Sequence, residues 1–462
     1  MCHGSMGLVP QIYLFECDIL NCTQHAGRRY FAGNILTFAQ IIFVTVFFYN
    51  IFLFLYSAGI FVVSVFNEKA KQWKAGRKDI FKKMQASIGD TRPIIWMHCA
   101  SLGEFEQGRP VLESLRKAYP NYKMLLTFFS PSGYEVRKNY NGADWVFYLP
   151  LDVPRNVARF LNIANPSLAI FVKYEYWYNY LNQVQKRKIP TILISAIFRK
   201  DKIFFKWYGG LHRKMLGCFN EIFVQDEKSR KLLEAILPKE KVTVAGDTRF
   251  DRVAEIASGF EPIDAIEKFV QGKNVLVAGS TWPDDEKNLN LILEKFENKI
   301  SLIIAPHEIS DNHINFLKRL FPQAILFSEL VEASKNELNH IDKNVLIINN
   351  IGMLSKLYYY ADITYIGGGF NSSGIHNTLE AAVYAKPVVF GPNYQKFSEA
   401  IGLIENKGGF SYSNENELIA IISELLRNAS YRLISGEIAG KFVRNNAGAT
   451  SAILNGLKQI SF

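Results

Sequence analysis

Two glutamates, Glu104 and Glu175, each follow a short apolar run of the sequence. Glu104 comes five residues after Ile94–Cys99 and stands where a helix is expected to start. Glu175 comes three residues after Leu168–Val172. The carboxyl ends of parallel strands share one sheet edge, so both carboxylates are expected there. A carboxylate in that place can accept a proton from an attacking hydroxyl. The alternative for each is a helix-start acid that complements the helix dipole.

Two turns in the second half of the chain offer groups that suit a phosphate. Gly279-Ser280-Thr281 follows the apolar run Val275–Ala278, and Pro306-His307 follows Leu302–Ala305. Backbone N–H groups and hydroxyls at a helix start can bind a phosphate. The alternatives are an ordinary Gly-Ser turn and a structural histidine.

A glycine-rich segment is the strongest local pattern. Gly367-Gly368-Gly369 ends an apolar run, a polar loop follows, and a helix is expected to open near Asn377, just after His376. Glycines let the backbone approach a ligand, and Glu380 could accept hydrogen bonds from ribose hydroxyls. The segment is neither a GxGxxG fingerprint nor a Walker loop, which disfavours NAD and ATPase functions. A plain glycine-rich turn is the alternative.

The elements that would position these residues alternate in type after Arg92. Amphipathic stretches such as Glu106–Ala118, Asn156–Ile163 and Lys228–Leu237 separate short apolar runs, which predicts parallel βαβ units. The alternation breaks at Asp251–Lys273. We therefore expect two doubly wound α/β domains joined near residue 255, facing a cleft. The expected strands are Ile94–Cys99, Met124–Phe129, Trp145–Leu149, Leu168–Val172, Thr191–Ser195, Ile222–Val224, Val242–Ala245, Val275–Ala278, Leu302–Ala305, Ala324–Phe327, Val345–Ile348, Ile363–Ile366 and Pro387–Phe390.

A long apolar segment precedes these domains. Ile35–Phe66 holds 32 residues without a charge, 25 of them apolar. A membrane helix needs about 20 such residues, and a buried core helix rarely exceeds about 14. The segment is also too long for a cleaved signal peptide. Because the βα alternation begins only after Arg92, neither domain's core is expected to need this helix.

The flanks of the apolar segment predict its orientation. Two basic residues precede it and seven follow, which places its C-terminal side in the cytoplasm. The basic segment could also grip anionic lipid headgroups, the alternative being a solvated helix face. The residues counted are Arg28 and Arg29 before the segment, and Lys69, Lys71, Lys74, Arg77, Lys78, Lys82 and Lys83 after it.

The net charge, the hydrophobic share and the cysteine count limit the classes of protein to which the chain can belong. Lys plus Arg number 53 and Asp plus Glu 43, which gives a net charge of +10. This favours anionic partners such as anionic lipid, phosphorylated glycolipid, sugar nucleotide or nucleic acid. A hydrophobic share of 48% excludes a disordered protein. Five cysteines without CxxC or Cys/His spacing argue against a disulfide framework and a zinc site.

Nine short motifs stand in order along the chain: His98-Cys99-Ala100-Ser101-Leu102-Gly103-Glu104, Phe128-Phe129-Ser130-Pro131-Ser132-Gly133, Tyr148-Leu149-Pro150-Leu151-Asp152, Arg187-Lys188-Ile189-Pro190, Gly246-Asp247-Thr248-Arg249-Phe250-Asp251, Gly279-Ser280-Thr281, Gly367-Gly368-Gly369, His376-Asn377-Thr378-Leu379-Glu380-Ala381-Ala382 and Pro387-Val388-Val389-Phe390-Gly391-Pro392. Each is weak alone, but the ordered set is specific. From about Ile35 to the C-terminus the chain resembles the 3-deoxy-D-manno-octulosonic acid (Kdo) transferases of Gram-negative lipopolysaccharide synthesis.

The resemblance implies a GT-B fold, an N-terminal anchor in the inner membrane and a catalytic body on the cytoplasmic face. It implies transfer of Kdo from CMP-Kdo to the tetraacylated lipid A precursor, lipid IVA, with inversion and without a metal or other cofactor. Glu104 corresponds to the family's catalytic base, and Glu175 to its acidic residue before Leu-Trp. With the glycine turn, the candidate donor-binding residues are Gly279, Ser280, Pro306, His307, Gly368, Gly369, His376, Asn377 and Glu380.

Two arginines of the family pattern are absent. The usual Pro-Arg-His is Pro306-His307 here, and the usual Asn-Ala-Arg is Ser195-Ala196-Ile197, with Arg199 two residues on. The implied partners are CMP-Kdo, lipid IVA and an anionic phospholipid surface, with no nucleic acid.

The expected domains are an extension of uncertain role at 1–34, a membrane anchor at 35–66 and a basic juxtamembrane segment at 67–92. An acceptor-binding domain at 93–255 and a nucleotide-sugar-binding domain at 256–462 follow, the last helix returning to the first domain. Two other functions remain open at this point. One is a GT-B glycosyltransferase that uses a UDP sugar on a lipid carrier. The other is a membrane-anchored, non-catalytic sugar-nucleotide-binding or scaffold protein.

Overall fold

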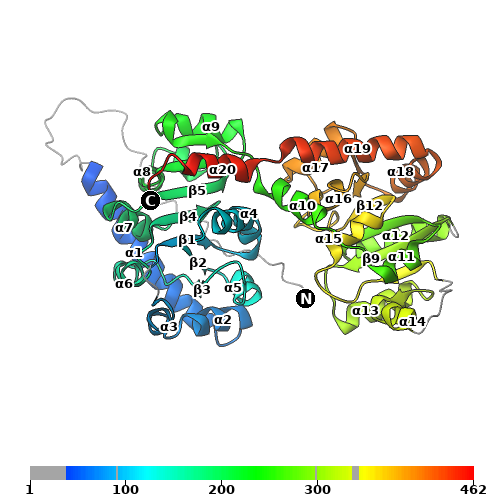
Figure 1. Ribbon diagram of the computed structural model, residues 1–462, viewed down its shortest axis with the longest axis horizontal. Coiled ribbons are helices and arrows are strands. Elements are labelled where there is room, and N and C mark those ends of the chain that lie inside the picture. The colour runs from blue at the N-terminus through cyan, green and yellow to red at the C-terminus, as the bar shows by residue number, and fades with distance from the viewer. Residues whose placement is uncertain (1–37, 90–91, 297–298, 336–342) are drawn as a thin grey trace, which may run out of the picture. The chain divides into compact units, whose positions relative to one another are not determined.

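The computed structural model describes residues 38–89, 92–296, 299–335 and 343–462, which form two compact units (Figure 1). Unit 1 holds the described residues up to Thr248 together with Ala449–Phe462, and unit 2 holds Arg249–Gly448. The expected boundary at 255/256 lies seven residues beyond this division, and both positions fall within helix α10 (Thr248–Ser258). The expected extension 1–34, and the start of the expected anchor at 35–37, lie outside the described residues.

Unit 1 is built on a seven-stranded parallel sheet in the order β3-β2-β1-β4-β5-β6-β7. The chain runs outward from β1 to β3, then returns to place β4 on the other side of β1. This reversal makes the β1/β4 junction a topological switch point, where doubly wound sheets bind ligands at their carboxyl edge. The strands are β1 (Ile94–Cys99), β2 (Lys123–Phe128), β3 (Trp145–Tyr148), β4 (Leu168–Val172), β5 (Thr191–Ala196), β6 (Glu221–Val224) and β7 (Val242–Val244).

Helices cover this sheet, so its central strands are buried along their whole length and read as continuous apolar runs. They are α1 (Phe38–Val63), α2 (Glu68–Arg77), α3 (Ile80–Ser87), α4 (Leu102–Ala118), α5 (Pro131–Arg137), α6 (Pro154–Ala164), α7 (Tyr178–Lys186), η1 (Ile203–Phe205), α8 (Gly210–Gly217), α9 (Glu227–Glu234), η2 (Lys239–Lys241) and α20 (Ala449–Leu457). The last of these, α20, packs on α4.

Unit 2 repeats the plan with the order β10-β11-β9-β8-β12-β13-β14, again all parallel, so its switch point lies between β8 and β12. The strands are β8 (Asn274–Thr281), β9 (Ile300–Pro306), β10 (Ile325–Leu326), β11 (Val345–Ile347), β12 (Ile363–Ile366), β13 (Val388–Phe390) and β14 (Gly409–Ser411). The helices are α10, α11 (Asp264–Val270), α12 (Pro283–Lys295), α13 (Asp311–Leu320), α14 (Phe327–Lys335), α15 (Leu354–Leu357), η3 (Tyr358–Tyr360), α16 (Leu379–Ala382), α17 (Ser398–Glu405), α18 (Glu415–Arg427) and α19 (Ala429–Asn446).

The predicted doubly wound α/β architecture is confirmed in both units. Three expected strands coincide with β1, β4 and β12, and the others differ only at their ends. Strand β14 was not expected, because it is three residues long and begins with glycine. The break at Asp251–Lys273 consists of two helices, α10 and α11, rather than a linker.

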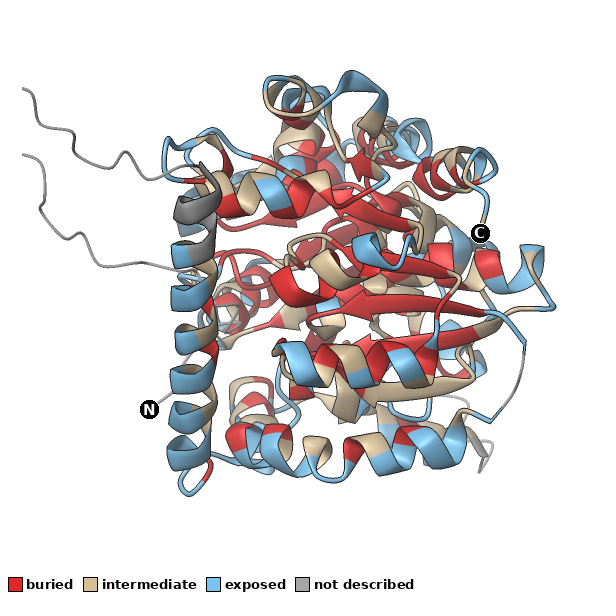
Figure 2. Ribbon diagram, turned by 90° about the vertical axis from the view of Figure 1, so that its left-hand side faces the viewer, coloured by how far each residue is buried: buried red, intermediate tan, exposed pale blue. Residues whose placement is uncertain are grey.

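Helix α1 packs along unit 1 through one stripe of side chains (Figure 2). Tyr49 and Leu53 are buried in the core, and Tyr56 and Ile60 continue the stripe at helical spacing as partly buried residues. The expectation that no core needs this helix is wrong. The apolar pattern predicted a helix but could not reveal that one of its faces completes the core of unit 1.

The opposite face of α1 is exposed and apolar. The Val44–Val63 segment of this helix has a mean hydropathy of 2.1. By length and composition only, it is long and apolar enough to cross a membrane. Side chains on this face include Phe47, Phe54, Leu55, Phe61 and Val62, each more than half exposed. The predicted apolar helix is confirmed, and its contact with a membrane stays a prediction.

A buried carboxylate ties α1 to unit 1. The Tyr49 hydroxyl donates a hydrogen bond to Asp152 Oδ2 at 2.6 Å. Asp152 also accepts the backbone N–H groups of Asn179 and Tyr180, at 3.0 and 2.9 Å. Burial raises the pKa of Asp152 to about 7, and these donors oppose that rise. The Tyr49 hydroxyl of α1 thus provides one of the hydrogen bonds that water would donate to an exposed carboxylate.

Replacing Tyr49 by Phe removes this donor and keeps the packing. We expect Tyr49→Phe to lower the free energy of unfolding by ~1.5–3 kcal/mol, the contribution of a hydrogen bond to a charged group. Tyr56→Phe is the matched control, because the Tyr56 ring packs on Trp73 and Phe129 and no described residue forms a hydrogen bond with its hydroxyl. The measurement is denaturant unfolding in neutral detergent. Equal effects of the two substitutions would contradict the role given to the Tyr49–Asp152 bond.

Candidate active site

Glu104 lies in the first turn of α4, directly after β1, at the switch point of the unit 1 sheet. Its side chain is 6% exposed, and Oε2 accepts the backbone N–H of Ala100. In this contact the carboxylate caps the loop between β1 and α4. Glu104 thus occupies the place of a helix-start acid, which was the alternative to a catalytic role. The position is still one from which a carboxylate can meet a ligand at the carboxyl edge of the sheet.

Glu175 lies in the loop between β4 and α7, on the other side of the same switch point. It is 2% exposed. Its Oε2 accepts the indole N–H of Trp177 at 2.6 Å and lies 2.8 Å from His98 Nε2. The second nitrogen of His98, Nδ1, lies 2.9 Å from the Thr127 hydroxyl and 3.1 Å from the Thr127 carbonyl oxygen. Trp177 of the same loop thus donates to Glu175 Oε2, and His98 of the neighbouring strand β1 lies against the same oxygen.

The two carboxylates affect each other electrostatically. Burial holds the pKa of Glu104 well above its ordinary value, and the charge of Glu175 raises that pKa further. The Ala100 N–H and the Lys173 ammonium act in the opposite direction but do not outweigh the burial. Burial and a neighbouring like charge both disfavour the charged form of a carboxyl group. The folded protein therefore favours the protonated form of Glu104.

Two basic residues lie at the same edge of the sheet. Lys173 precedes the Glu175 loop and has a φ of +65°, a conformation that is costly for a residue with a side chain. Arg199 follows β5 and is exposed, and its charge reaches Tyr174. Arg199 lies two residues after Ile197, the position at which the family pattern has an arginine. Together, Lys173 and Arg199 would suit an anionic ligand at this edge of the sheet.

The candidate donor site of unit 2 centres on three stacked rings. Trp282 stacks on His307 at 4.6 Å between ring centroids, and His307 stacks on His376 at 4.5 Å. The Trp282 indole N–H donates to His376 Nε2 at 3.3 Å. These residues follow β8, β9 and β12 at the carboxyl edge, where β8 and β12 form the switch point. The structure thus brings together His307 and His376, which are 69 positions apart in the sequence.

The histidines in this stack are neutral at physiological pH. Burial lowers the pKa of His376 to about 4, and the nearby His307 lowers it further. Desolvation lowers the pKa of His307 as well. A neutral imidazole contacts a phosphate as a hydrogen-bond donor and supplies no charge. Any attraction of these rings for a nucleotide therefore comes from stacking and directed hydrogen bonds.

Asp285 organises the loops around the stack. Its Oδ2 accepts the backbone N–H groups of Gly368 and Trp282, at 2.9 and 3.0 Å. Its Oδ1 accepts the Tyr365 hydroxyl at 2.8 Å. One buried carboxylate thus joins the first turn of α12 to the glycine-rich turn after β12.

The glycines of the candidate site are required by the protein's own packing. A Cβ on Gly367 would lie 2.3 Å from the Ser280 carbonyl oxygen, and one on Gly369 would lie 2.5 Å from Gly391 Cα. A Cβ on Gly279 would meet the Tyr358 hydroxyl at 2.0 Å. Gly368 has a φ of +89°. These glycines therefore allow close contact between neighbouring segments, and their part in admitting a ligand stays a prediction.

The remaining candidates lie around this turn. Ser280 has a φ of +53°, and Pro306 ends β9 in register with Thr281. Asn377 Nδ2 donates to Glu380 Oε1 at 3.0 Å. The expected helix near Asn377 is α16, which has only four residues and begins at Leu379. A helix this short gives little dipole to bind a phosphate, so that part of the expectation is corrected.

Three residues at the two sites were missed from the sequence. His98 could have been found as a polar residue inside the apolar strand β1, and Asp285 as an acid three residues after a helix start. Trp282 gave no distinguishing signal. Among the described residues, no three His, Cys, Asp or Glu side chains gather closely enough to hold a metal ion.

Comparisons with known proteins fit this geometry. Residues 72–252 match the family model of 3-deoxy-D-manno-octulosonic-acid transferase (kdotransferase). A 3-deoxy-D-manno-octulosonic acid transferase of Haemophilus influenzae is 27% identical over 377 residues, covering 79% of this chain and 86% of that protein. One from Aquifex aeolicus is 28% identical over 350 residues, covering 74% and 88%. The predicted resemblance to the Kdo transferases, and with it the class of a glycosyltransferase, is confirmed.

Solved structures support the fold alone. The UDP-GlcNAc 2-epimerase of Neisseria meningitidis superimposes with a TM-score of 0.56 at 18% identity, covering 79% of this chain and 100% of that one. A glycosyltransferase from Rickettsia africae gives 0.51 at 15% identity, covering 80% and 99%. These likenesses agree with the predicted GT-B type fold of two Rossmann-like units.

Replacing Glu104 by Gln tests its protonation. Because folding raises the pKa of Glu104, the folded state binds its proton more tightly, and this contribution to stability is lost as pH rises through the folded pKa. We expect Glu104→Gln to raise Tm at pH 8 by a few degrees, about 2–4 °C for each ~1 kcal/mol. The gain should shrink toward pH 4, where the Glu104 carboxyl binds its proton in the unfolded state as well as in the folded state.

The control for this measurement is Glu240→Gln. Glu240 is an exposed acid of the same unit, and within the part of the chain that the structure describes no ion pair or hydrogen bond engages its side chain. Its replacement should leave Tm unchanged at both pH values. A Glu104→Gln protein less stable than wild type at pH 8 would show that Glu104 is charged in the folded state.

Proposed function

We propose that this relative of the Kdo transferases transfers Kdo from CMP-Kdo to the lipid A precursor lipid IVA. The observation that carries the proposal is the buried pair Glu104–Glu175 at the β1/β4 switch point, inside the segment 72–252 that matches the family model. A carboxylate with a raised pKa is a stronger base than an exposed one, which suits removal of a proton from a hydroxyl.

In the proposed reaction Glu104 is the general base. A hydroxyl of the acceptor gives its proton to the Glu104 carboxylate as its oxygen forms a bond to the anomeric carbon of Kdo. The bond from that carbon to the CMP phosphate oxygen breaks on the opposite face, and CMP leaves with the electron pair. Attack from the face opposite the leaving group inverts the anomeric configuration. Because Glu104 accepts the proton, it must be deprotonated before the reaction.

Glu175 acts on this step through Glu104. Its own Oε2 is occupied by the Trp177 N–H and faces His98, so it is poorly placed to take the acceptor's proton. Its charge keeps the pKa of Glu104 high and so keeps Glu104 basic. His98 and Trp177 hold the Glu175 carboxylate in place. In this proposal Glu175 is a positioning and tuning residue rather than the second acid of a catalytic pair.

Unit 2 is proposed to hold the nucleotide of the donor. The stacked rings of Trp282, His307 and His376 offer apolar surface and neutral hydrogen-bond donors. Glu380 keeps one carboxylate oxygen beside Asn377 and is proposed to accept hydrogen bonds from ribose hydroxyls. We propose that no metal takes part, and activity should then survive EDTA.

The protein is proposed to work at the cytoplasmic face of the inner membrane. The exposed apolar face of α1 and the basic residues that follow it support contact with an anionic membrane. Lipid IVA and CMP-Kdo are both anionic, and the protein's net charge of +10 favours anionic partners. Holding enzyme and acceptor on one surface raises their effective concentration.

The direct test of function is mass spectrometry of lipid IVA incubated with CMP-Kdo and the detergent-solubilised protein. We expect a product heavier by one or more Kdo residues, and a loss of 10²–10⁴-fold in rate for Glu104→Gln, the usual effect of removing a general base. Calorimetry with CMP and UDP supplies the control, and CMP should bind while UDP should not. Selective binding of UDP would favour a UDP-sugar transferase, and CMP binding without turnover would favour a binding protein.

The pH dependence of kcat/KM tests the coupling of the two glutamates. Because Glu104 must lose its proton, the rate should rise with pH through its raised pKa. Glu175→Gln removes a like charge, which lowers the pKa of Glu104, so this acid limb should move to lower pH. A limb that stays in place would assign the titration to another buried acid, such as Asp152 with its pKa of about 7.

A further inference from the structure

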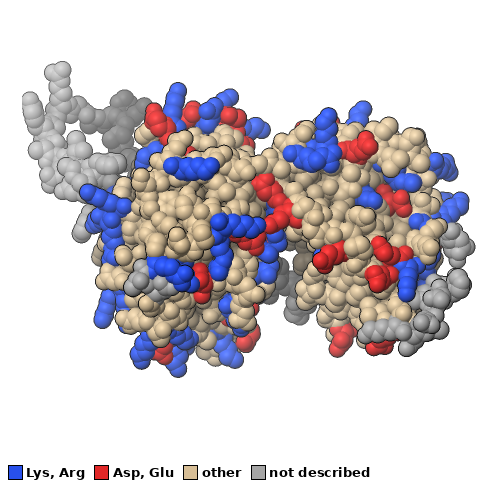
Figure 3. Space-filling model, in the orientation of Figure 1, with Lys and Arg blue, Asp and Glu red and all other residues tan. Residues whose placement is uncertain are grey.

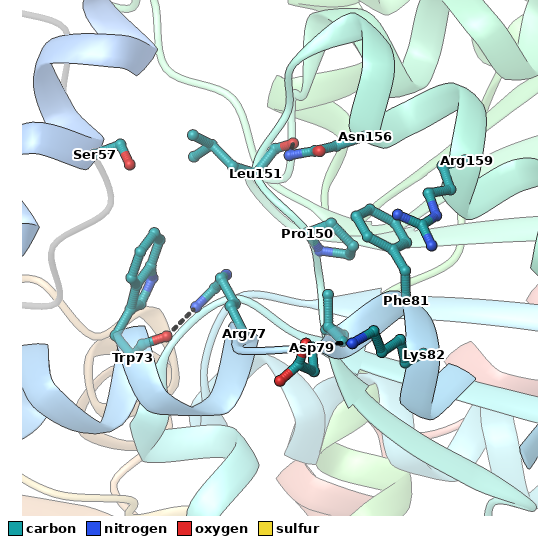
Figure 4. Close-up of a pocket in the computed structure, with 11 residues that line it drawn as sticks. Ser57, Trp73, Arg77, Asp79, Phe81, Lys82, Pro150, Leu151, Asn156 and Arg159 are labelled. Atoms are coloured by element: carbon teal, nitrogen blue, oxygen red, sulfur yellow. Dashed lines mark hydrogen bonds and ion pairs between the residues drawn. The ribbon is translucent and has the colours of Figure 1, made fainter. Parts of the chain in front are cut away.

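A pocket of about 440 Å³ lies in unit 1, apart from the two glutamates (Figure 4). Four segments far apart in the sequence enclose it: α1, the α2–α3 connection, the loop after β3, and α6. Its lining holds three basic residues and one acidic residue. The lining residues used below are Ser57, Trp73, Arg77, Asp79, Lys82 and Arg159.

Arg77 forms the inner wall of the pocket. Its guanidinium donates to the carbonyl oxygens of Leu149 at 2.9 Å and Phe129 at 2.8 Å, the residues that begin the loops after β3 and β2. It also lies 3.9 Å from the centre of the Trp73 ring. Burial lowers the pKa of Arg77 to about 9, and among the described residues no carboxylate forms an ion pair with it. Arg77 is thus a partly buried cation held by carbonyl oxygens and aromatic rings, without an anion among the described residues.

Trp73 adds an unused donor to the same wall. Its indole Nε1 is buried and has no hydrogen-bond partner among the described residues. Figure 4 shows the indole beside Arg77, whose Nη1 donates to the Trp73 carbonyl oxygen at 3.2 Å. Buried donors without partners are rare and costly, so this N–H calls for an acceptor that a ligand could supply.

The mouth of the pocket is basic on balance. Arg159 is exposed, and its guanidinium lies 4.6 Å from the centre of the Phe81 ring with no acidic partner among the described residues. Lys82 lies 3.5 Å from Asp79, and both side chains are more than half exposed. Asp79 therefore offsets Lys82 in part. Arg77 and Arg159 remain as two cations that no acid in the lining balances.

The pocket opens beside the apolar helix. Ser57 of α1 forms one wall, and the exposed apolar face of the same helix includes Phe54, Leu55 and Phe61. Figure 3 shows Lys and Arg side chains gathered over the α2–α3 end of unit 1. A surface that joins an apolar stripe to basic residues suits the boundary between acyl chains and headgroups. The group that such a boundary presents to a cationic pocket is a lipid phosphate.

We propose that this pocket binds the phosphate group of a membrane lipid, between Arg77 and Trp73 at its wall and Arg159 and Lys82 at its mouth. A phosphate oxygen accepts the free N–H of Trp73, and the phosphate charge neutralises Arg77. Arginine is suited to this because its planar guanidinium can donate two parallel hydrogen bonds to a phosphate. The acyl chains of the lipid then lie along the exposed face of α1.

The test uses the full chain in neutral detergent and isothermal calorimetry with dihexanoyl phosphatidic acid. We expect saturable binding, with Arg159→Gln raising the dissociation constant about fivefold, the effect of removing one basic residue next to a lipid phosphate. Asp79→Asn should tighten binding, because it removes the one acid of the lining. Lys69→Gln is the matched control: Lys69 is an exposed base of α2 outside the lining, and its loss should change the constant by less than about twofold.

Four results would overturn the proposal. They are an absence of saturable binding to the wild type, equal weakening by Lys69→Gln and Arg159→Gln, weaker binding in Asp79→Asn, or inorganic phosphate binding as tightly as the short-chain lipid. The variants avoid Arg77, because that residue also holds two loops of the sheet edge. Calorimetry needs no turnover, so its outcome does not depend on the proposed transferase activity.

The phosphate could belong to the acceptor or to bulk phospholipid, and two further measurements with Arg159→Gln separate these sources. If the proposed function holds, a higher KM for lipid IVA in neutral micelles with unchanged kcat assigns the pocket to the acceptor. Weaker co-sedimentation with vesicles of phosphatidylcholine and phosphatidic acid at 4:1, with KM unchanged, assigns it to phospholipid. If neither changes, the pocket binds no membrane lipid.

Discussion

Two carboxylates buried side by side at one switch point impose the constraint on which the rest of unit 1 depends. Glu104 and Glu175 are both buried away from the solvent that would screen a charge, and the charge of Glu175 opposes ionisation of Glu104. The surrounding residues resolve this conflict unevenly. His98 and Trp177 serve Glu175, and the backbone of the β1–α4 loop serves Glu104. The result is a Glu104 carboxyl that favours its protonated form and is a stronger base once it loses that proton.

Unit 2 reaches its site by the same topology but with different chemistry. Its switch point carries neutral rings and a tightly packed glycine turn rather than a charged pair. Asp285 fixes that turn by accepting backbone N–H groups, so the loop geometry depends on one buried carboxylate. Stacking and directed hydrogen bonds would bind a nucleotide without a strong electrostatic pull. This accords with a chain that lacks two arginines of the family pattern.

The fold could be predicted because β1, β4 and β12 are continuous apolar runs, which buried parallel strands require. The places of Glu104 and Glu175 followed from those strands. Other roles depend on contacts between distant segments, which periodicity does not encode. Examples of such contacts are the face of α1 that enters the core, the carbonyl oxygens around Arg77, and the packing of Gly367 and Gly369.

The central claim is that Glu104 holds a proton in the folded protein because of burial and Glu175. Carbon-13 NMR of glutamate carboxyls, with the Glu104 signal identified by its loss in Glu104→Gln, measures this directly. The account predicts a titration midpoint well above that of an exposed glutamate, and a lower midpoint in the Glu175→Gln protein. A Glu104 signal that titrates at the ordinary pKa of an exposed glutamate, with or without Glu175, would contradict it.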